Sequence, residues 1–212
     1  CFISSPYDHP VMRDNSLPKD GYWKKVTDLC KKHDVLTIVD DVRAGFRINL
    51  RGSNVAFDFE PDMICFGKAI ANGHPLAALV GTDSLKEAAE SVYFTGTQFF
   101  SGPPMSAALA TLNELEKLDA PSLLIEYGKK LNSRLEKVAS EKGYNLVVSG
   151  ISSMPYYRLE GVSFETHIKW IDECVKRGVY MLAYHNHFVS LAHTDEDIDF
   201  IEAAAKQAFD NL

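Results

Sequence analysis

The sequence predicts an α/β fold with a largely parallel sheet, followed by a smaller α+β domain. Three short, continuously apolar runs, residues 35–39, 63–66 and 76–80, are typical of strands that are buried on both faces. Each run ends abruptly in charged or glycine-containing residues, and a segment with helical periodicity precedes the first run. Helices that alternate with such strands indicate a largely parallel sheet.

The N-terminal part of the chain, residues 1–118, is expected to contain this sheet. It opens with an apolar strand at residues 1–3, followed by a polar stretch that contains proline. Asp20 can then cap a helix that runs to His33, because its apolar residues recur at helical spacing on one face. An Ala-rich helix at residues 106–118 closes this part.

The C-terminal part, residues 119–212, alternates differently and predicts a small α+β domain. A long charged helix comes first, and shorter strands and helices follow it. The expected elements are a helix at 122–142, strands at 146–148 and 156–159, a helix at 164–177, strands near 180–182 and 188–190, and a helix from Asp195.

Composition and charge exclude several classes of partner. The net charge is −7 and no basic tract is present, which argues against nucleic acid or an anionic membrane surface. No apolar run approaches the length needed to cross a bilayer. The four cysteines are far apart and show no CxxC spacing, so we expect reduced, buried thiols in a cytoplasmic protein. The chain opens inside a strand without an initiator Met, so we expect it to be part of a longer protein.

Ionisable side chains follow two of the predicted strands. Asp40 and Asp41 come directly after the first apolar run, and Gly67 and Lys68 after the second. Ligands of open α/β sheets bind at the carboxyl ends of the strands. A lysine and a carboxylate there suit pyridoxal 5′-phosphate (PLP), which needs an amine for a Schiff base and an acid beside its pyridine nitrogen. On spacing alone, a solvated turn and a surface lysine stay open as alternatives.

Three segments carry a family resemblance. The runs VDDVRAGFR at residues 39–47 and FGKAIANGHP at 66–75, with Pro61-Asp62 before the second, resemble the cofactor segments of class III, fold-type-I PLP-dependent aminotransferases. Residues 178–198 are similar to the tail of glutamate-1-semialdehyde aminomutases. The resemblance implies that residues 1–118 are the C-terminal part of the large PLP-binding domain, and that residues 119–212 are the small domain.

The resemblance also implies roles for individual residues. Asp40 is expected to pair with the pyridine nitrogen of PLP, Val42 to pack against the ring, and Lys68 to form the Schiff base. Thr97 is expected to reach the phosphate of the cofactor in the other subunit of a homodimer with shared active sites. Capping of the Ala-rich helix is the alternative role for Thr97, and Thr95 and Ser101 are close enough to compete for the phosphate.

The expected reaction is transfer of an amino group between a small-molecule donor and acceptor, by an aminotransferase or an aminomutase. Racemisation, epimerisation or decarboxylation on the same fold would use the same residues, and a non-catalytic binding module could retain the fold. Asp41 stands where the family usually has Glu, and Ser5-Pro6 where many members have Glu-Pro, which leaves the substrate open. The family's glycine-rich phosphate loop and its ring-stacking aromatic residue are absent, so this chain alone is not expected to hold PLP tightly or turn over.

The histidines suggest one further interpretation. His185 and His187, on one face of a predicted strand and near His193, could bind the metal of a hydrolase. No cysteine or carboxylate completes a known ligand spacing, so we prefer a polar surface and predict no metal.

Overall fold

The computed structural model describes all 212 residues, and the chain divides into two units. Unit 1 comprises Cys1–Pro6 and Pro18–Pro121, and unit 2 comprises Tyr7–Leu17 and Ser122–Leu212. The domain boundary predicted at residue 119 stays a prediction for the intact protein. Residues 7–17, in the polar stretch after the first strand, were assigned to the large domain with residues 1–118, but in the structure they belong to unit 2.

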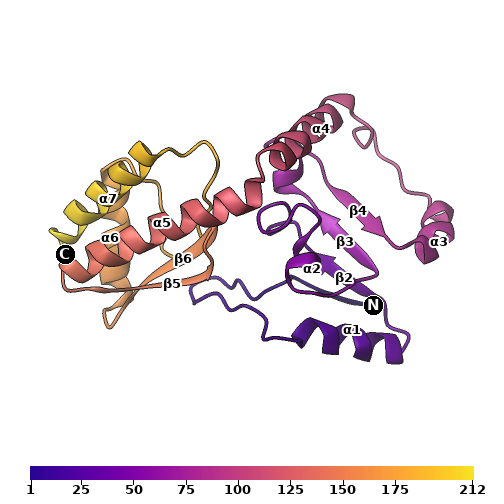
Figure 1. Cartoon of the computed structure of the whole chain (residues 1–212), viewed down its shortest axis with the longest axis horizontal. Coiled ribbons are helices and arrows are strands. Elements are labelled where there is room, and N and C mark those ends of the chain that lie inside the picture. The colour runs from indigo at the N-terminus through magenta and orange to yellow at the C-terminus, as the bar shows by residue number, and fades with distance from the viewer. The chain divides into compact units, whose positions relative to one another are not determined.

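Unit 1 is built on a four-stranded sheet in the order β1-β2-β3-β4 (Figure 1). The first three strands are parallel, which confirms the predicted α/β fold with a mostly parallel sheet. The fourth strand runs antiparallel to β3, a direction that an apolar run cannot reveal. The elements are β1 (Phe2–Ser4), α1 (Tyr22–Lys32), β2 (Thr37–Asp40), α2 (Ser53–Ala56), β3 (Met63–Phe66), the 3-10 helix η1 (Lys68–Ala71), β4 (Ala78–Gly81), the 3-10 helix η2 (Asp83–Leu85), α3 (Lys86–Ser91) and α4 (Gly102–Lys117).

One face of this sheet packs against helices. Trp23 of α1 stacks on Phe59 with ring centroids 4.4 Å apart, and both contact Val39 of β2. The Trp23 indole N–H donates to the carbonyl of Pro6 at 2.8 Å. Helix α1 begins after Gly21, whose φ of 70° suits glycine, so the predicted cap at Asp20 is wrong.

The other face of the sheet is open, although the apolar runs predicted burial on both faces. Ile3 is 59% exposed and Leu79 is 60% exposed. The register places both on the same side of the sheet as Asp40 and Cys65. The exposed carboxylate of Asp40 therefore lies at the end of an apolar, uncovered sheet face.

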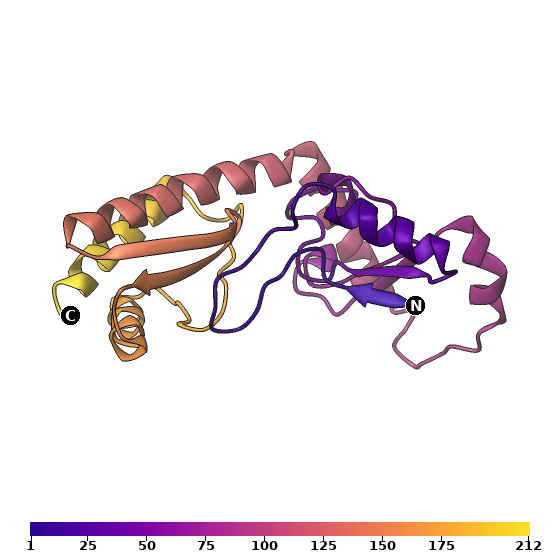
Figure 2. The ribbon, with the colours of Figure 1, turned by 90° about the horizontal axis from the view of Figure 1, so that it is seen from below.

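Unit 2 packs helices against a β-hairpin. Its elements are α5 (Ala120–Glu141), β5 (Asn145–Ile151), β6 (Met154–Glu160), α6 (Phe164–Lys176) and α7 (Asp195–Phe209). Figure 2 shows α5 running along the hairpin. Trp170 of α6 is fully buried and stacks on Phe209 of α7 with centroids 5.0 Å apart. The Thr194 side chain and Asp197 form a capping box at the start of α7.

Residues 7–17 pack on the hairpin as well. The Arg158 guanidinium of β6 donates two hydrogen bonds to the Asp14 carboxylate, at 2.8 and 2.9 Å. The Asn15 N–H donates to the Ser149 hydroxyl of β5 at 3.0 Å. These bidentate and backbone contacts explain why this segment is part of unit 2 although it is remote in sequence.

The strands predicted near residues 180–182 and 188–190 are wrong. Both segments are irregular, although Met181 and Val189 are buried in the core. The backbone N–H groups of His187 and Val189 donate to the carbonyls of Pro155 and Ser153, at 2.7 and 3.1 Å. The apolar residues of these segments thus fill the core, while isolated hydrogen bonds replace a regular ladder.

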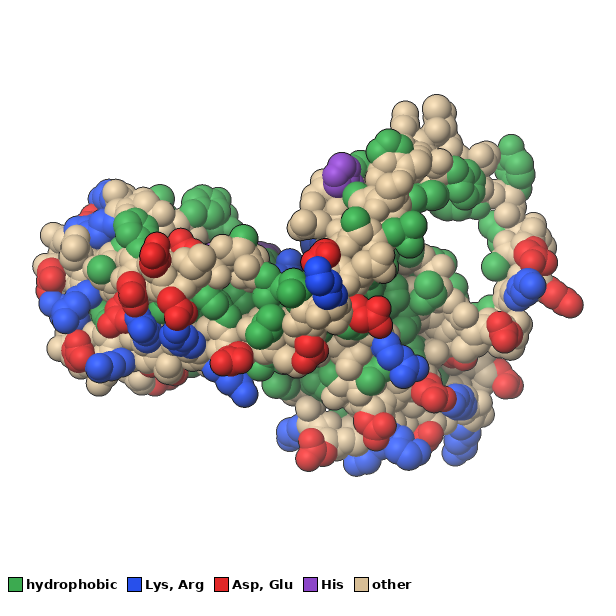
Figure 3. All heavy atoms as spheres, turned by 45° about the horizontal axis from the view of Figure 1, so that its top comes forward, with side chains coloured by type: hydrophobic (Ala, Val, Ile, Leu, Met, Phe, Trp, Pro, Cys, Tyr) green, Lys and Arg blue, Asp and Glu red, His purple; other side chains and the backbone are tan.

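The surface carries mixed charge. Figure 3 shows acidic and basic side chains interspersed on the visible face, without a large patch of one sign. On α5 and α7, Lys130 pairs with Asp195 at 2.5 Å, and Arg134 with Glu202 at 3.0 Å. Lys130–Asp195 is exposed and Arg134–Glu202 is half-buried, and surface pairs of this kind stabilise a protein by about 1 kcal/mol or less each. No helix has both the length and the apolar character that crossing a membrane requires.

Candidate active site

The ends of β2 and β3 bring the two predicted ionisable groups to one edge of the sheet. Asp40 is the last residue of β2 and pairs in register with Cys65 of β3. Strand β3 ends at Phe66, and Gly67 and Lys68 follow. Because the two strands are parallel, Asp40 and Lys68 lie at the same edge. Both side chains are exposed and can reach a ligand.

Val42 lies between these two groups. Its backbone N–H donates to the Asp40 carboxylate at 3.2 Å, which holds the carboxylate close to the turn after β2. A Cβ atom added to Gly67 would come within 3.1 Å of Val42 Cγ1. The missing side chain of Gly67 thus lets Val42 pack beside the residue that precedes Lys68. The structure therefore brings together Asp40, Val42 and Lys68.

The backbone of Lys68 is in an uncommon conformation. Its φ is 44°, in the left-handed region that non-glycine residues seldom adopt. It opens η1, whose Ile70 and Ala71 are buried in a core with Phe66. Backbone outliers of this kind persist only where the surrounding structure determines them, and they concentrate at functional sites.

Thr97 is apart from the other three predicted residues. It is exposed, in the turn-rich segment 92–101 between α3 and α4. Figure 1 shows this segment beyond β4, on the side away from β2. No hydrogen bond joins Thr97 to Asp40, Val42 or Lys68, so the chain does not bring Thr97 to the edge that holds them.

Asp41 and Ser53 form a contact that the sequence did not predict. Asp41 is only 1% exposed, and its carboxylate accepts hydrogen bonds from both the backbone N–H and the hydroxyl of Ser53. Burial raises the pKa of Asp41 to about 6, although the bonds from Ser53 oppose that shift. The sequence marked Asp41 as a carboxylate after the first strand and as a shorter residue than the family's usual Glu, but a serine twelve positions away carries no signal of its own.

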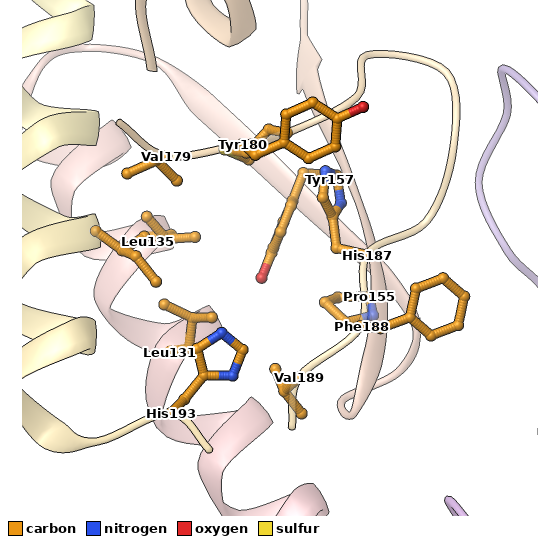
Figure 4. Close-up of a pocket in the computed structure, with 12 residues that line it drawn as sticks. Leu131, Leu135, Pro155, Tyr157, Val179, Tyr180, His187, Phe188, Val189 and His193 are labelled. Carbon is orange, nitrogen blue, oxygen red and sulfur yellow. The ribbon is translucent and has the colours of Figure 1, made fainter. Parts of the chain in front are cut away.

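The histidines of unit 2 lie around the core of that unit and do not gather with other ligand-type side chains. His187 lies beside a cavity of about 90 Å³, lined mainly by apolar side chains of α5, β6 and residues 179–193 (Figure 4). Its Nε2 atom accepts from the Leu182 N–H at 3.1 Å, and burial lowers the pKa of His187 to about 4. Neither these histidines nor any other side chains form a group of three or more His, Cys, Asp or Glu that could hold a metal ion.

Comparison with known proteins decides the family. The family model for class III aminotransferases matches residues 15–208. The chain belongs to the class III aminotransferase family. The predicted family is thereby confirmed, and PLP is the cofactor of this class of enzymes. The match covers most of both units, so it does not depend on the Lys68 segment alone.

Curated relatives of this class III chain include both reaction types. The aminopentol aminotransferase of Sphingopyxis macrogoltabida is 35% identical, over 98% of this chain and 49% of its own length. The 3-aminobutyryl-CoA aminotransferase of Cloacimonas acidaminovorans is 31% identical, over 97% of this chain and 51% of its own. A glutamate-1-semialdehyde 2,1-aminomutase of Methanosarcina acetivorans is also 31% identical, over 86% of this chain and 47% of its own. The chain spans about half the length of these relatives.

Solved structures confirm the fold-type-I architecture. The FumI protein of a Sphingopyxis species, determined in its PLP internal aldimine form, superposes with a TM-score of 0.94 and is 34% identical. That superposition covers 99% of this chain and 51% of FumI. The β-phenylalanine aminotransferase of Variovorax paradoxus, 19% identical, superposes with a TM-score of 0.83 over 99% of this chain and 51% of its own, which shows the same fold.

Proposed function

We propose that this protein is a PLP-dependent enzyme that transfers an amino group on a small amino-carbonyl compound. The observation that carries the proposal is the shared edge of β2 and β3, where Asp40, Val42 and Lys68 lie together in a chain of the class III family. An amine and a carboxylate that are both exposed at one sheet edge fit the two ends of a pyridine-aldehyde cofactor.

The residues fit PLP in distinct ways. When bound, PLP supplies an electron-withdrawing ring that stabilises negative charge on the carbon bearing the amino group. Asp40 would hold a proton on the ring nitrogen, because a carboxylate favours the charged form of a nearby base. Val42, fixed beside Gly67, would pack against the ring. The Lys68 amine would attach the cofactor and, when free, would move a proton at the substrate carbon.

Covalent labelling tests the role of Lys68. The intact protein is incubated with PLP, reduced with borohydride, and mapped by peptide mass spectrometry. We expect one pyridoxyl group, on the peptide that contains Lys68, and none in the Lys68→Ala variant. Lys86→Ala, at an exposed lysine of α3, is the matched control and should label as the unchanged protein does. A label elsewhere, or no label, would refute the proposed function.

The reaction type is open between aminotransferase and aminomutase, because the relatives include both. An aminotransferase leaves its amino group on a second molecule, whereas an aminomutase returns it to a neighbouring carbon of the same one. Amino substrates labelled with ¹⁵N distinguish the two outcomes. Product chirality and carbon dioxide release test the remaining alternatives of racemisation, epimerisation and decarboxylation.

We propose further that the active protein is a homodimer in which Thr97 reaches the cofactor phosphate of the partner subunit. Exposed aromatic rings on the segment that carries Thr97 support this: Tyr93 is 92% exposed and Phe100 is 81% exposed. Figure 3 shows apolar side chains at the surface over the part of unit 1 that carries α3 and α4.

Subunit mixing tests this arrangement. Lys68→Ala and Thr97→Ala variants should each have strongly reduced activity alone. In a mixed dimer, one of the two sites would combine the unchanged Lys68 of one subunit with the unchanged Thr97 of the other. Mixing under dissociating conditions should therefore restore up to one active site in each mixed dimer. An active monomer in light scattering, or no recovery on mixing, would refute the shared site.

A further inference from the structure

The buried carboxylate of Asp41 holds the chain segment that follows β2. Its Oδ2 atom accepts the Ser53 backbone N–H at 2.7 Å, and its Oδ1 atom accepts the Ser53 hydroxyl. Ser53 opens α2 and is itself fully buried. Asp41 therefore closes residues 41–53 into a loop whose two ends are joined by two hydrogen bonds to a charged group, which are stronger than bonds between neutral groups.

The closed loop wraps around the last residue of β3. The Asp41 carbonyl accepts the Gly45 N–H at 2.9 Å, which makes a tight turn. A Cβ atom on Gly45 would lie 2.8 Å from the Phe66 ring, and one on Gly52 would lie 3.4 Å from it. Phe46 of the same loop packs on Phe66 with ring centroids 4.9 Å apart. The loop thus depends on close contact with the residue that is two positions before Lys68.

Asp40 and Val42 flank Asp41 directly in the chain. The backbone of Asp40 belongs to the ladder of β1, β2 and β3, whereas its exposed carboxylate accepts the Val42 N–H of the following turn. The orientation of the Asp40 carboxylate and the place of Val42 therefore depend on the turn that begins at Asp41. The backbone of Asp41 is held on one side by its N–H, which donates to the Cys65 carbonyl at 3.0 Å, and on the other by the bonds to Ser53.

We propose that Asp41 is a positioning residue: by binding Ser53 it holds Asp40 and Val42 in place for the cofactor without touching it. The proposal rests on the function proposed above, because it assigns a purpose to the same sheet edge. It extends the site from the three residues that would contact the ring to a buried pair beneath them.

The test uses the intact protein and three variants. Asp41→Asn removes the charge, and Ser53→Ala removes only the hydroxyl and keeps the backbone donor. Asp58→Asn is the matched control, because Asp58 is exposed just beyond α2 and its φ of 53° suits asparagine. Thermal melts identify any variant that fails to fold, and Ser53→Ala decides the matter if Asp41→Asn does not fold.

Two measurements are made on each folded variant. The first is the rate of tryptic cleavage at Arg43 and Arg47, which lie inside the loop and report its opening without any cofactor. The second is the dissociation constant of PLP, measured from its visible absorption. We expect faster cleavage at both arginines and about tenfold weaker PLP binding in Asp41→Asn, with a smaller change of both in Ser53→Ala. Asp58→Asn should match the unchanged protein.

The outcomes separate this inference from the proposed function. If the loop opens in the variants but PLP binds as before, Asp41 is structural and the inference is wrong. Unchanged cleavage in both variants would overturn it too, because the loop would then not depend on the pair. Failure of the unchanged protein to bind PLP would overturn the proposed function itself, and this inference with it.

Discussion

The pH dependence of stability offers a direct test of the burial of Asp41. Burial raises the pKa of this carboxyl from 3.8 to about 6. A group whose pKa is higher in the folded state favours folding when protonated, and this contribution is lost as the pH rises through the folded pKa. Asp41 should therefore make the protein less stable at neutral pH than at pH 4, relative to a variant that cannot ionise at this position.

The magnitude follows from the size of the shift. Each pKa unit corresponds to about 1.4 kcal/mol. A shift from 3.8 to about 6 therefore changes the unfolding free energy by roughly 3 kcal/mol between a pH at which Asp41 is fully protonated and a pH at which it is fully ionised. Between about pH 4.5 and about pH 7, the difference in unfolding free energy between the unchanged protein and Asp41→Asn should change by roughly 2 kcal/mol. The substitution also alters the bonds to Ser53, but that effect is nearly independent of pH and only offsets the whole curve.

Tryptophan fluorescence can follow unit 1 alone. The protein has two tryptophans, Trp23 in unit 1 and Trp170 in unit 2. The indole N–H of Trp170 is buried without a hydrogen-bond partner, so Trp170→Phe leaves no polar group unpaired and provides a suitable background. Urea unfolding is then measured at several pH values for both proteins. A difference in unfolding free energy that stays constant from about pH 4.5 to about pH 7 would refute a buried, ionising Asp41.

Two further substitutions test the packing of each unit. In unit 2, Gly128→Ala should lower the unfolding free energy by about 2 kcal/mol, because a Cβ there would lie 2.0 Å from the Ser152 carbonyl oxygen. The control Ser133→Ala, at an exposed site of the same helix, should leave the unfolding free energy unchanged or slightly higher. If Gly128→Ala and Ser133→Ala changed the unfolding free energy equally, the clash would be refuted. In unit 1, Asp62→Ala should lower the unfolding free energy by about 1–3 kcal/mol, because the Asp62 carboxylate accepts hydrogen bonds from the N–H and the hydroxyl of Thr37 at 2.7 and 2.8 Å. These bonds lower the pKa of Asp62. In urea titrations, the decrease in unfolding free energy caused by Asp62→Ala should therefore be complete above about pH 4 and should shrink as the pH falls. A decrease that does not vary with pH would contradict this.

The apolar runs predicted where strands form, but not how every strand pairs. Residues 63–66 were placed without error, because a short run bounded by Asp62 and Gly67 leaves few alternatives. The direction of β4 could not be predicted, since a continuous apolar run looks the same in either direction. Near Met181 and Val189 the same apolar signal predicted strands that do not form. The apolar residues are there because they are buried in the core, but only isolated hydrogen bonds join these segments to their neighbours.

The candidate site shows a similar limit. Asp40 and Lys68 could be predicted because strand ends are recognisable in a sequence and parallel strands end at the same edge. The pairing of Asp41 with Ser53 could not, because it depends on how a glycine-containing loop folds around Phe66. Exposed groups that act on a ligand thus leave a pattern in the sequence, whereas the buried contacts that fix them depend on the tertiary structure.

The support beneath the site is shared by all three residues that would contact the cofactor. Phe46 of the loop, Phe66 of β3, and Ile70 and Ala71 of η1 form one buried cluster with Ala108 of α4. Val42 is part of the loop, Asp40 directly precedes the loop, and η1 begins at Lys68. A single core therefore supports all three residues: the carboxylate of Asp40, the side chain of Val42 and the amine of Lys68. A rigid common support can maintain the uncommon backbone of Lys68, whose φ of 44° would otherwise relax at a gain of roughly 1 kcal/mol. The relative placement of carboxylate and amine is therefore a property of this core, and a cavity at Phe66 should disturb both ends of the cofactor together.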